Sequence, residues 1–552
     1  MQRDAVACPR RLGPAISSDS LARHEGRLLR ENAAVIFKSP LPDVVIPEIP
    51  LTPYVLAKAK ELGSKAAFIE GISDQPVSYA ELDDRVRRLA GGLLERGLAK
   101  GEVVAIMAPN CPDYAVVFHG VAMAGGVVTT INPTYTEREV HHQLNDAAAT
   151  KLITIPMFLE TAVAGSNDTG VKETIVIGGA DGYQSLDDLM GEPLSEQIPV
   201  DLDDVVVLPY SSGTTGLSKG VMLTHRNLVA NIEQALGVIE MTSKDSFLAV
   251  LPFFHIYGMQ ILMNCGLRVG ATIVTLPRFD LELFLKLHQE HKLTKAFVAP
   301  PMVVALAKHP IIDNYDLSAL NLVFSGAAPL SAELAAECGA RIDCEVVQGY
   351  GMTELSPLTH ATPTHGFKPG SVGVTAPNTE TTIVDPSTGE QLDIDQDGEV
   401  WIRGPQVMKG YLNNDEATNA TIDNDGWLHT GDVGHVDSDG HLYVVDRLKE
   451  LIKYKGFQVP PAELEALLLT HPKIADAAVI GLPDDDAGEI PSAYIVLRAD
   501  TEATAAEIQE FVAGQVANYK QIRKVTFMDA IPKSPSGKIL RRILRDQENA
   551  AT

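Results

Sequence analysis

The sequence predicts an α/β protein with a large, multi-sheet layered N-terminal domain and a small α+β C-terminal domain. Short apolar runs typical of buried strands alternate with helical patterns, which indicates layered and mostly parallel sheets. The 552 residues are also too many for one small core. Beyond residue 446, a segment of about a hundred residues has strand and helix patterns of its own and can form an independent domain.

The elements of the large domain, predicted for residues 35–446, can be assigned in order. Ser78 and Glu81 have the spacing of a helix capping box, and apolar residues recur at helical spacing from there until Gly97. Residues 40–53 contain several prolines and predict an extended strap. Runs that indicate buried strands lie at 103–107, 152–155, 174–177, 205–208 and 322–324.

The small domain is predicted for residues 447–552. We expect helices at 463–469 and after the capping-box pair Thr504 and Glu507, and extended segments at 477–481 and 493–497. Residues 1–34 are expected to form an N-terminal extension without stable structure.

Composition and charge restrict the classes of partner. With 45% hydrophobic and 21% charged residues, the chain is typical of globular proteins. Its formal charge of −27 opposes non-specific binding to nucleic acid or anionic membranes. Five cysteines without a CxxC spacing indicate free thiols in a reducing compartment. No apolar run reaches transmembrane length and no secretory signal is evident, so we expect a cytoplasmic protein without stable membrane insertion; the oligomeric state is left open.

A glycine- and hydroxyl-rich segment follows the strand-like run at 205–208. Glycine lets the backbone approach a ligand and turn its N–H groups inward, Ser and Thr add short donors, and Lys219 adds one positive charge. This inventory suits a triphosphate, although the spacing is not that of a Walker A motif and a surface turn is the alternative. The candidate phosphate contacts are Ser211, Ser212, Gly213, Thr214, Thr215 and Lys219.

The eleven residues of this segment from Tyr210 to Gly220 resemble the signature of the adenylate-forming superfamily, which includes acyl- and aryl-CoA ligases, luciferases and peptide-synthetase adenylation domains. Ser218 stands where many members have proline. The resemblance covers about residues 35–545. The segments that look most like the 4-coumarate–CoA ligase branch are VLPFFHIYG, SGAAPL, QGYGMTELSP, KELIKYKGFQVPPAELEALL and PKSPSGKILRR.

A second group of residues is expected to bind the nucleotide and its metal. Tyr350 offers a flat face for adenine, Thr353 a hydroxyl, and Glu354 a hard carboxylate suited to Mg²⁺, although a Thr-Glu pair also begins many helices. The resemblance implies that Asp432, which we expect in a turn, accepts hydrogen bonds from the ribose. The positions that it assigns to ATP or AMP are Gln348, Gly349, Tyr350, Thr353, Asp432, Arg447 and Lys449.

The resemblance also implies sites for the acid and for CoA. His255 would lie between the carboxylate and the thiol path, although a packed core histidine is the alternative. The positions that would line a slot for a planar phenylpropenoate are Tyr257, Ala327, Gly349, Gly351, Pro357 and Leu358. CoA would contact Arg278, Lys455 and Gly456; the two lysines around Gly456, Lys453 and Lys455, are a local basic exception in an acidic chain.

Lys538 lies in a Pro/Ser/Gly-rich loop and matches the mobile catalytic lysine of the superfamily. In the resembling enzymes the small domain rotates about a hinge, here Lys449. The rotation withdraws Lys538 and presents Lys453 and Gln458 to the adenylate for the thioester step.

The resemblance therefore implies an ATP-dependent carboxylate–CoA ligase that acts on 4-coumarate and related hydroxycinnamates through an acyl-AMP intermediate. Its ligands would be a small carboxylic acid, ATP, CoA and Mg²⁺. Three alternatives remain: a medium-chain fatty acyl-CoA ligase, a luciferase-like oxygenase, and an adenylation module that serves a carrier protein.

Overall fold

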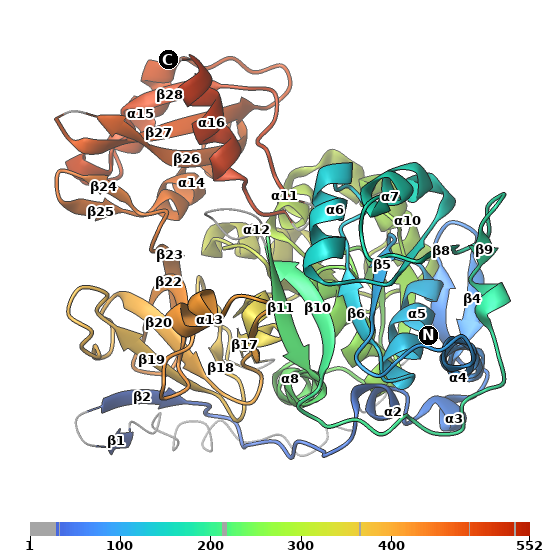
Figure 1. The fold of residues 1–552 in the computed structure, drawn as a ribbon. Coiled ribbons are helices and arrows are strands. Elements are labelled where there is room, and N and C mark those ends of the chain that lie inside the picture. The colour runs from blue at the N-terminus through green and yellow to red at the C-terminus, as the bar shows by residue number, and fades with distance from the viewer. Residues whose placement is uncertain are drawn as a thin grey trace, which may run out of the picture.

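The computed structural model describes residues 29–31, 34–211, 218–363, 366–484, 486–534 and 537–551. Within them the chain forms three sheets in a large body and one in a small C-terminal body, drawn in orange to red in Figure 1. The layered α/β class predicted from the sequence is confirmed.

The eight-stranded sheet carries the predicted phosphate segment. It has the order β21-β11-β10-β6-β5-β7-β8-β9, and its strands from β6 to β9 are parallel. β10 pairs parallel to β6 but antiparallel to β11, so β10 and β11 form a hairpin. The strands are β5 (Val103–Met107), β6 (Val127–Thr130), β7 (Lys151–Thr154), β8 (Glu173–Val176), β9 (Gln184–Ser185), β10 (Val205–Ser211), β11 (Lys219–Thr224) and β21 (Gly410–Tyr411).

The nine-stranded sheet has a parallel centre and antiparallel ends, in the order β18-β17-β16-β15-β14-β12-β13-β3-β4. Parallel strands bring their carboxyl ends to one edge, where ligands bind in open α/β sheets. The strands are β3 (Ala66–Glu70), β4 (Gln75–Ser78), β12 (Ser246–Ala249), β13 (Thr272–Thr275), β14 (Lys295–Val298), β15 (Leu322–Ser325), β16 (Val346–Gly351), β17 (Leu358–Ala361) and β18 (Val374–Thr375).

The six-stranded antiparallel sheet leads into the small domain. Its order is β1-β2-β19-β20-β22-β23, with β1 (Leu29–Glu31), β2 (Ala34–Lys38), β19 (Glu380–Val384), β20 (Gly398–Arg403), β22 (Leu428–Val436) and β23 (Leu442–Arg447). Asp432, which the sequence predicts in a turn, lies inside β22. The prediction was wrong because pairing with β20 and β23 on both sides extends the strand through Gly431.

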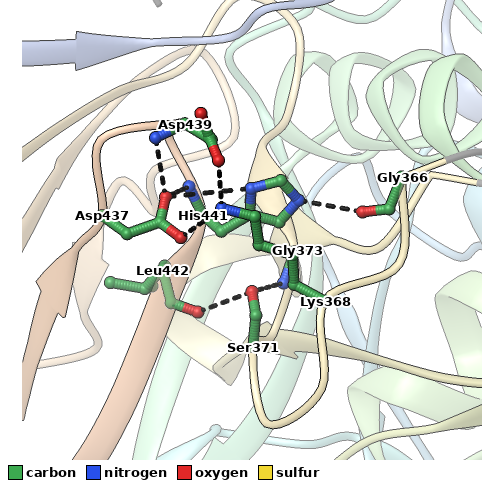
Figure 2. Close-up of polar contacts among 8 residues, drawn as sticks. All are labelled: Gly366, Lys368, Ser371, Gly373, Asp437, Asp439, His441 and Leu442. Carbon is green, nitrogen blue, oxygen red and sulfur yellow. Dashed lines mark hydrogen bonds and ion pairs between the residues drawn. The ribbon is translucent and has the colours of Figure 1, made fainter.

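Polar contacts fix the turn between β22 and β23 to the segment that joins β17 to β18 (Figure 2). Lys368 Nζ pairs with Asp437 at 2.7 Å and also with Asp439. The ring of His441 hydrogen-bonds the Gly366 carbonyl at 3.0 Å, and Ser371 Oγ donates to the Leu442 carbonyl at 3.0 Å. These contacts tie the antiparallel sheet to the nine-stranded sheet.

The small domain has a sheet with the path β25-β24-β27-β26, to which β28 adds parallel to β27. Its strands are β24 (Ile452–Tyr454), β25 (Phe457–Val459), β26 (Ile474–Asp484), β27 (Gly488–Leu497) and β28 (Lys524–Phe527), and its helices are α14 (Pro461–Leu469), α15 (Ala505–Ala513) and α16 (Arg541–Ala551). A separate apolar core, which includes Leu464, Leu468, Val479 and Ile495, lies inside it. A core of its own is expected of an independent domain.

Helices of the large body cover its sheets. They are α2 (Leu51–Val55), α3 (Ala59–Leu62), α4 (Tyr79–Glu95), α5 (Pro112–Met123), α6 (Glu137–Asp146), α7 (Leu159–Ser166), α8 (His225–Val238), η3 (Gly258–Cys265), α9 (Gly266–Val269), α10 (Leu281–His291), α11 (Pro300–Lys308), α12 (Ala332–Ile342) and α13 (Asp415–Thr421). The predicted strap ends earlier than expected, because Leu51 begins α2 and proline is tolerated in a first helical turn. In the described part of the chain, no helix is long and apolar enough to cross a membrane.

Candidate active site

The end of β16 and the strand pair β22–β23 bring three of the predicted nucleotide residues together. Tyr350 Oη donates a hydrogen bond to Asp432 Oδ2 at 2.7 Å, and Arg447 Nε lies 3.2 Å from Asp432 Oδ1. Asp432 and Arg447 are register partners across the two strands. Burial, together with the charge of Asp432, raises the pKa of Tyr350, so the phenol stays neutral and can donate. Each carboxylate oxygen has two lone pairs, so Asp432 can still accept from a vicinal diol.

Glu354 belongs to a second cluster, which includes a residue that the sequence reasoning missed. Glu354 is buried, and Tyr411 Oη donates to its Oε1 at 2.9 Å. Lys219 Nζ lies 4.6 Å from the centre of the Tyr411 ring. Tyr411 therefore links the lysine at the end of the phosphate segment to the predicted Mg²⁺ ligand. Tyr411 follows Gly410 in a short edge strand, and no local spacing marks it as a site residue.

The donor set near Glu354 fits Mg²⁺ bound mainly by a nucleotide. No group of three or more His, Cys, Asp or Glu side chains that could hold a metal ion occurs among the residues described above. Mg²⁺ usually takes one or two protein carboxylates and completes its shell with water and substrate phosphates. A single buried carboxylate beside the predicted phosphate segment meets that requirement.

The ends of the phosphate segment are held together by the β10–β11 hairpin. Ser211 and Lys219 are register partners in this antiparallel pair. The predicted contacts Ser212, Gly213, Thr214 and Thr215 lie outside the described residues. Tyr210, next to Ser211, donates to Asp146 Oδ2 at 2.6 Å and so anchors the hairpin to α6.

Close packing explains the small residues at the carboxyl ends of β15 and β16. Tyr257 Oη donates to the Phe324 carbonyl at 3.2 Å, and a Cβ on Gly326 would lie 2.9 Å from the Tyr257 ring. A Cβ on Gly349 would lie 2.6 Å from the Phe324 ring, and one on Gly351 would overlap the Pro357 carbonyl. Larger side chains are therefore excluded by the protein itself, whatever ligand binds.

The other predicted residues of this edge lie on the same strands. Leu358 is a register partner of Gly351, and the segment 326–330 after β15 includes Ala327. Gln348 exchanges hydrogen bonds with the backbone of Leu330 at 3.2–3.3 Å. Thr353 lies with Glu354 in the short 3₁₀ helix η5 (Thr353–Leu355). This edge of the sheet therefore brings the residues predicted to bind the carboxylic acid together with some of the residues predicted to bind the nucleotide.

Lys538 reaches the large domain from the small one. Burial lowers the pKa of Lys538 to about 8, and the charge of Arg447 contributes; Asp432 acts in the opposite direction. Burial also lowers the pKa of His255 to about 4, again with a contribution from the charge of Lys538. Charge effects between groups weaken with distance, so Arg447 and Asp432 lie close enough to influence the pKa of Lys538, and Lys538 lies close enough to influence the pKa of His255. A Cβ on Gly537 would lie 3.2 Å from Ala299 Cβ, which shows how closely this loop approaches the large domain.

The residues predicted for the thioester step are not part of this cluster. Lys453, Lys455, Gly456 and Gln458 lie exposed on the β24–β25 hairpin, with Lys455 and Gly456 in its turn at φ values of +50° and +84°. Figure 1 shows this hairpin on the opposite side of the small domain from α11. Arg278 is exposed on the segment after β13, and Lys449 is exposed between β23 and β24.

Comparisons with known proteins find matches over most of the chain. The AMP-binding enzyme family matches residues 56–412, and its C-terminal domain matches residues 463–538. The chain is 47% identical over 523 residues to 4-coumarate–CoA ligase 3 of Oryza sativa subsp. japonica, covering 93% of this chain and 94% of the relative.

Two solved structures share the fold. ATP-bound MatB from Rhodopseudomonas palustris has a TM-score of 0.83 at 30% identity, covering 91% of this chain and all of that chain (100%). The anthranilate CoA ligase AuaEII in complex with anthranoyl-AMP has a TM-score of 0.86 at 25% identity, covering 92% of this chain and 99% of that chain.

Proposed function

This chain belongs to the AMP-binding family of adenylate-forming enzymes and is an acid–thiol ligase, and from this we propose that its substrates are 4-coumarate and related hydroxycinnamates. ATP and CoA are the co-substrates of this class. The similarity to 4-coumarate–CoA ligase 3 over 93% of the chain is the main support for the choice of acid. The catalytic assignment is supported by the close approach of the Gly537–Lys538 segment to Ala299 of the large domain, and by burial, which with the charge of Arg447 lowers the pKa of Lys538.

In the first half-reaction a carboxylate oxygen of the acid attacks the α-phosphorus of ATP. The new bond joins the acid to AMP, the bond between the α-phosphorus and the bridging oxygen breaks, and pyrophosphate leaves. Negative charge gathers around the α-phosphate, so preorganised positive groups lower the barrier. We propose that the Lys538 ammonium stabilises this charge, that Asp432 accepts hydrogen bonds from the ribose hydroxyls, and that the ring of Tyr350 lies against adenine.

The remaining nucleotide residues act on the phosphates. Lys219 and the hydroxyls of the phosphate segment hold the β- and γ-phosphates, with Ser211 at the start of that segment. Mg²⁺, when bound, neutralises phosphate charge, and Glu354 would hold it. Tyr411 fixes the Glu354 carboxylate through the 2.9 Å hydrogen bond and so sets its direction.

In the second half-reaction the CoA thiol attacks the acyl carbon. The carbon–sulfur bond forms, the bond to the AMP oxygen breaks, and the thiol proton is released. For this step the small domain rotates about Lys449 and presents the β24–β25 hairpin, so that Lys453 and Gln458 contact the adenylate. The hairpin turn then lies over the pantetheine, with Arg278 near the CoA nucleotide. His255 is neutral at pH 7 because its pKa is about 4, so it contributes orientation rather than charge.

The domain boundary follows from the same reasoning. β23 ends at Arg447 inside the antiparallel sheet of the large body, and β24 begins at Ile452 inside the small one. The intervening segment, 448–451, contains the proposed hinge. Because the antiparallel sheet of the large body also includes Leu29–Glu31, Ala34 and Arg447, we propose that the two domains that move relative to each other meet in the segment 448–451.

Acid-dependent pyrophosphate release tests the proposal. The acids are cinnamate, 4-coumarate, caffeate, ferulate, benzoate and octanoate, each with and without CoA. We expect the highest kcat/KM with a hydroxycinnamate and thioester formation only with CoA. Preference for octanoate would indicate a fatty acyl-CoA ligase, and transfer to a carrier protein in place of CoA would indicate an adenylation module. Light emission with luciferin and oxygen would indicate an oxygenase.

A further inference from the structure

Helix α14 of the small domain is hydrogen-bonded to the large body at both of its ends. At its start, the backbone N–H of Ala462 donates to Asp446 Oδ2 at 2.8 Å, and Asp446 belongs to β23. At its end, Lys308 Nζ donates to the Leu469 carbonyl at 3.2 Å, and Lys308 is the last residue of α11. One contact therefore precedes the proposed hinge in the chain, and the other lies on a separate element of the large body.

The charges at the two ends match the dipole of the helix. A carboxylate is favourable at the positive N-terminus and an ammonium at the negative C-terminus, where the last carbonyls lack helical partners. Asp446 is buried, and Lys308 also lies 3.7 Å from Glu337 of α12, which keeps its ammonium near α14. Both contacts depend on the present orientation of the small domain, because each joins it to the large body.

Helix α11 connects the second of these contacts, that of Lys308, to the loop of Lys538. Its first turn packs against Gly537, whose hypothetical Cβ would lie 3.2 Å from Ala299 Cβ and 3.3 Å from Pro301 Cδ. Its last residue is Lys308. The element that holds the end of α14 thus also supports the residue that precedes Lys538.

We propose that Lys308 and Asp446 are positioning residues for the adenylation half-reaction, because they hold α14 at both ends and thereby keep Lys538 at the nucleotide. Both contacts break when the small domain rotates for the thioester step. This inference rests on the proposed function for the half-reactions, but the contacts themselves can be tested without a substrate.

Substitution Lys308→Met removes the ammonium and keeps most of the aliphatic stem. Lys308→Arg keeps the positive charge and serves as the conservative variant. Lys286→Met is the matched control, because Lys286 is an exposed lysine of helix α10 that pairs only at 3.9 Å with Glu290 of the same helix. Asp446→Asn is the second variant: Oδ1 accepts from Arg447 N at 2.7 Å and Oδ2 from Ala462 N, and an amide has one acceptor oxygen for these two donors.

The first measurement is the rate of tryptic cleavage after Lys449 in the ligand-free enzyme, with fragments identified by mass. Loss of one charge-assisted hydrogen bond should expose the hinge more often, and we expect cleavage to accelerate about three- to tenfold in Lys308→Met and in Asp446→Asn. Lys308→Arg and Lys286→Met should match the wild type. Equal cleavage rates in all five proteins would overturn the proposal, even if the enzyme were inactive with every acid tested.

The second measurement separates the half-reactions with 4-coumarate. Lys308→Met should lower acid-dependent ATP–pyrophosphate exchange about three- to tenfold and leave thioester formation from supplied 4-coumaroyl-AMP unchanged or faster. Recovery of exchange in Lys308→Arg supports the role of the charge. Equal loss in both half-reactions would show a general structural effect and would contradict the positioning role. Absence of exchange in the wild type would instead refute the proposed function.

Discussion

Adenylation should slow as Lys538 loses its proton, and the structure gives the pH at which this occurs. Burial lowers the pKa of Lys538 to about 8, so most of the ammonium is charged at neutral pH. At about pH 9, one unit above that pKa, roughly a tenth of the enzyme retains the charge, and kcat/KM for ATP should fall about tenfold. The phosphates of bound ATP favour the charged form, so kcat should decline at a higher pH than kcat/KM.

The assay is pyrophosphate release with cinnamate, which has no phenol to titrate, from about pH 7 to about pH 9.5. In Lys538→Arg the guanidinium stays protonated, so the decline should disappear even if the plateau is lower. Lys533→Met is the matched control from the same loop, because Lys533 pairs with Asp476 at 2.6 Å, and it should keep the wild-type profile. A flat profile in the wild type, or the same decline in Lys538→Arg, would refute the role of this ammonium.

Further substitutions separate the two half-reactions and the metal site. Gly537→Ala and Gly456→Ala impose the same left-handed strain, since both glycines have φ of +84°, at roughly 1–2 kcal/mol. Gly537→Ala should slow pyrophosphate exchange, and Gly456→Ala should slow thioester formation from supplied acyl-AMP. The reverse pattern would contradict the assignment of the Gly537 loop to adenylation and of the Gly456 turn to the thioester step. Tyr411→Phe removes the donor to Glu354, at about 1–2 kcal/mol, and should raise the Mg²⁺ concentration for half-maximal exchange several-fold. If the Mg²⁺ concentration for half-maximal exchange is unchanged, the assignment of Glu354 as the Mg²⁺ ligand is contradicted.

Local signals in the sequence predicted most elements well. Ser78 caps α4 as expected, with its Oγ accepting from the Glu81 N–H at 3.1 Å, because capping depends only on neighbours along the chain. The turn expected around Asp432 was wrong, since pairing with β20 on one side and β23 on the other overrides a local Thr-Gly signal. Likewise, Pro53 suggested that the extended strap continues to residue 53. The structure instead forms helix α2 there, because Leu51, Tyr54 and Val55 pack into the core.

The candidate site was harder to predict than its individual members. Tyr350 and Asp432 were each assigned to the nucleotide, but their 2.7 Å hydrogen bond joins positions 82 residues apart. Tyr411 was missed because its role depends on a contact with Glu354 across 57 residues and on Lys219 at another strand end. Contacts of this kind follow from the packing of sheets, and a sequence pattern contains no direct signal for them.

If one chain builds two active sites by moving the small domain, Lys538→Ala and Lys453→Ala should lose different half-reactions in paired assays. We expect Lys538→Ala to abolish acid-dependent pyrophosphate exchange and to spare thioester formation from supplied acyl-AMP. Lys453→Ala should lose mainly the thioester step. If each variant loses both half-reactions to the same extent, the two lysines serve one undivided site and the small domain does not build a second site by moving.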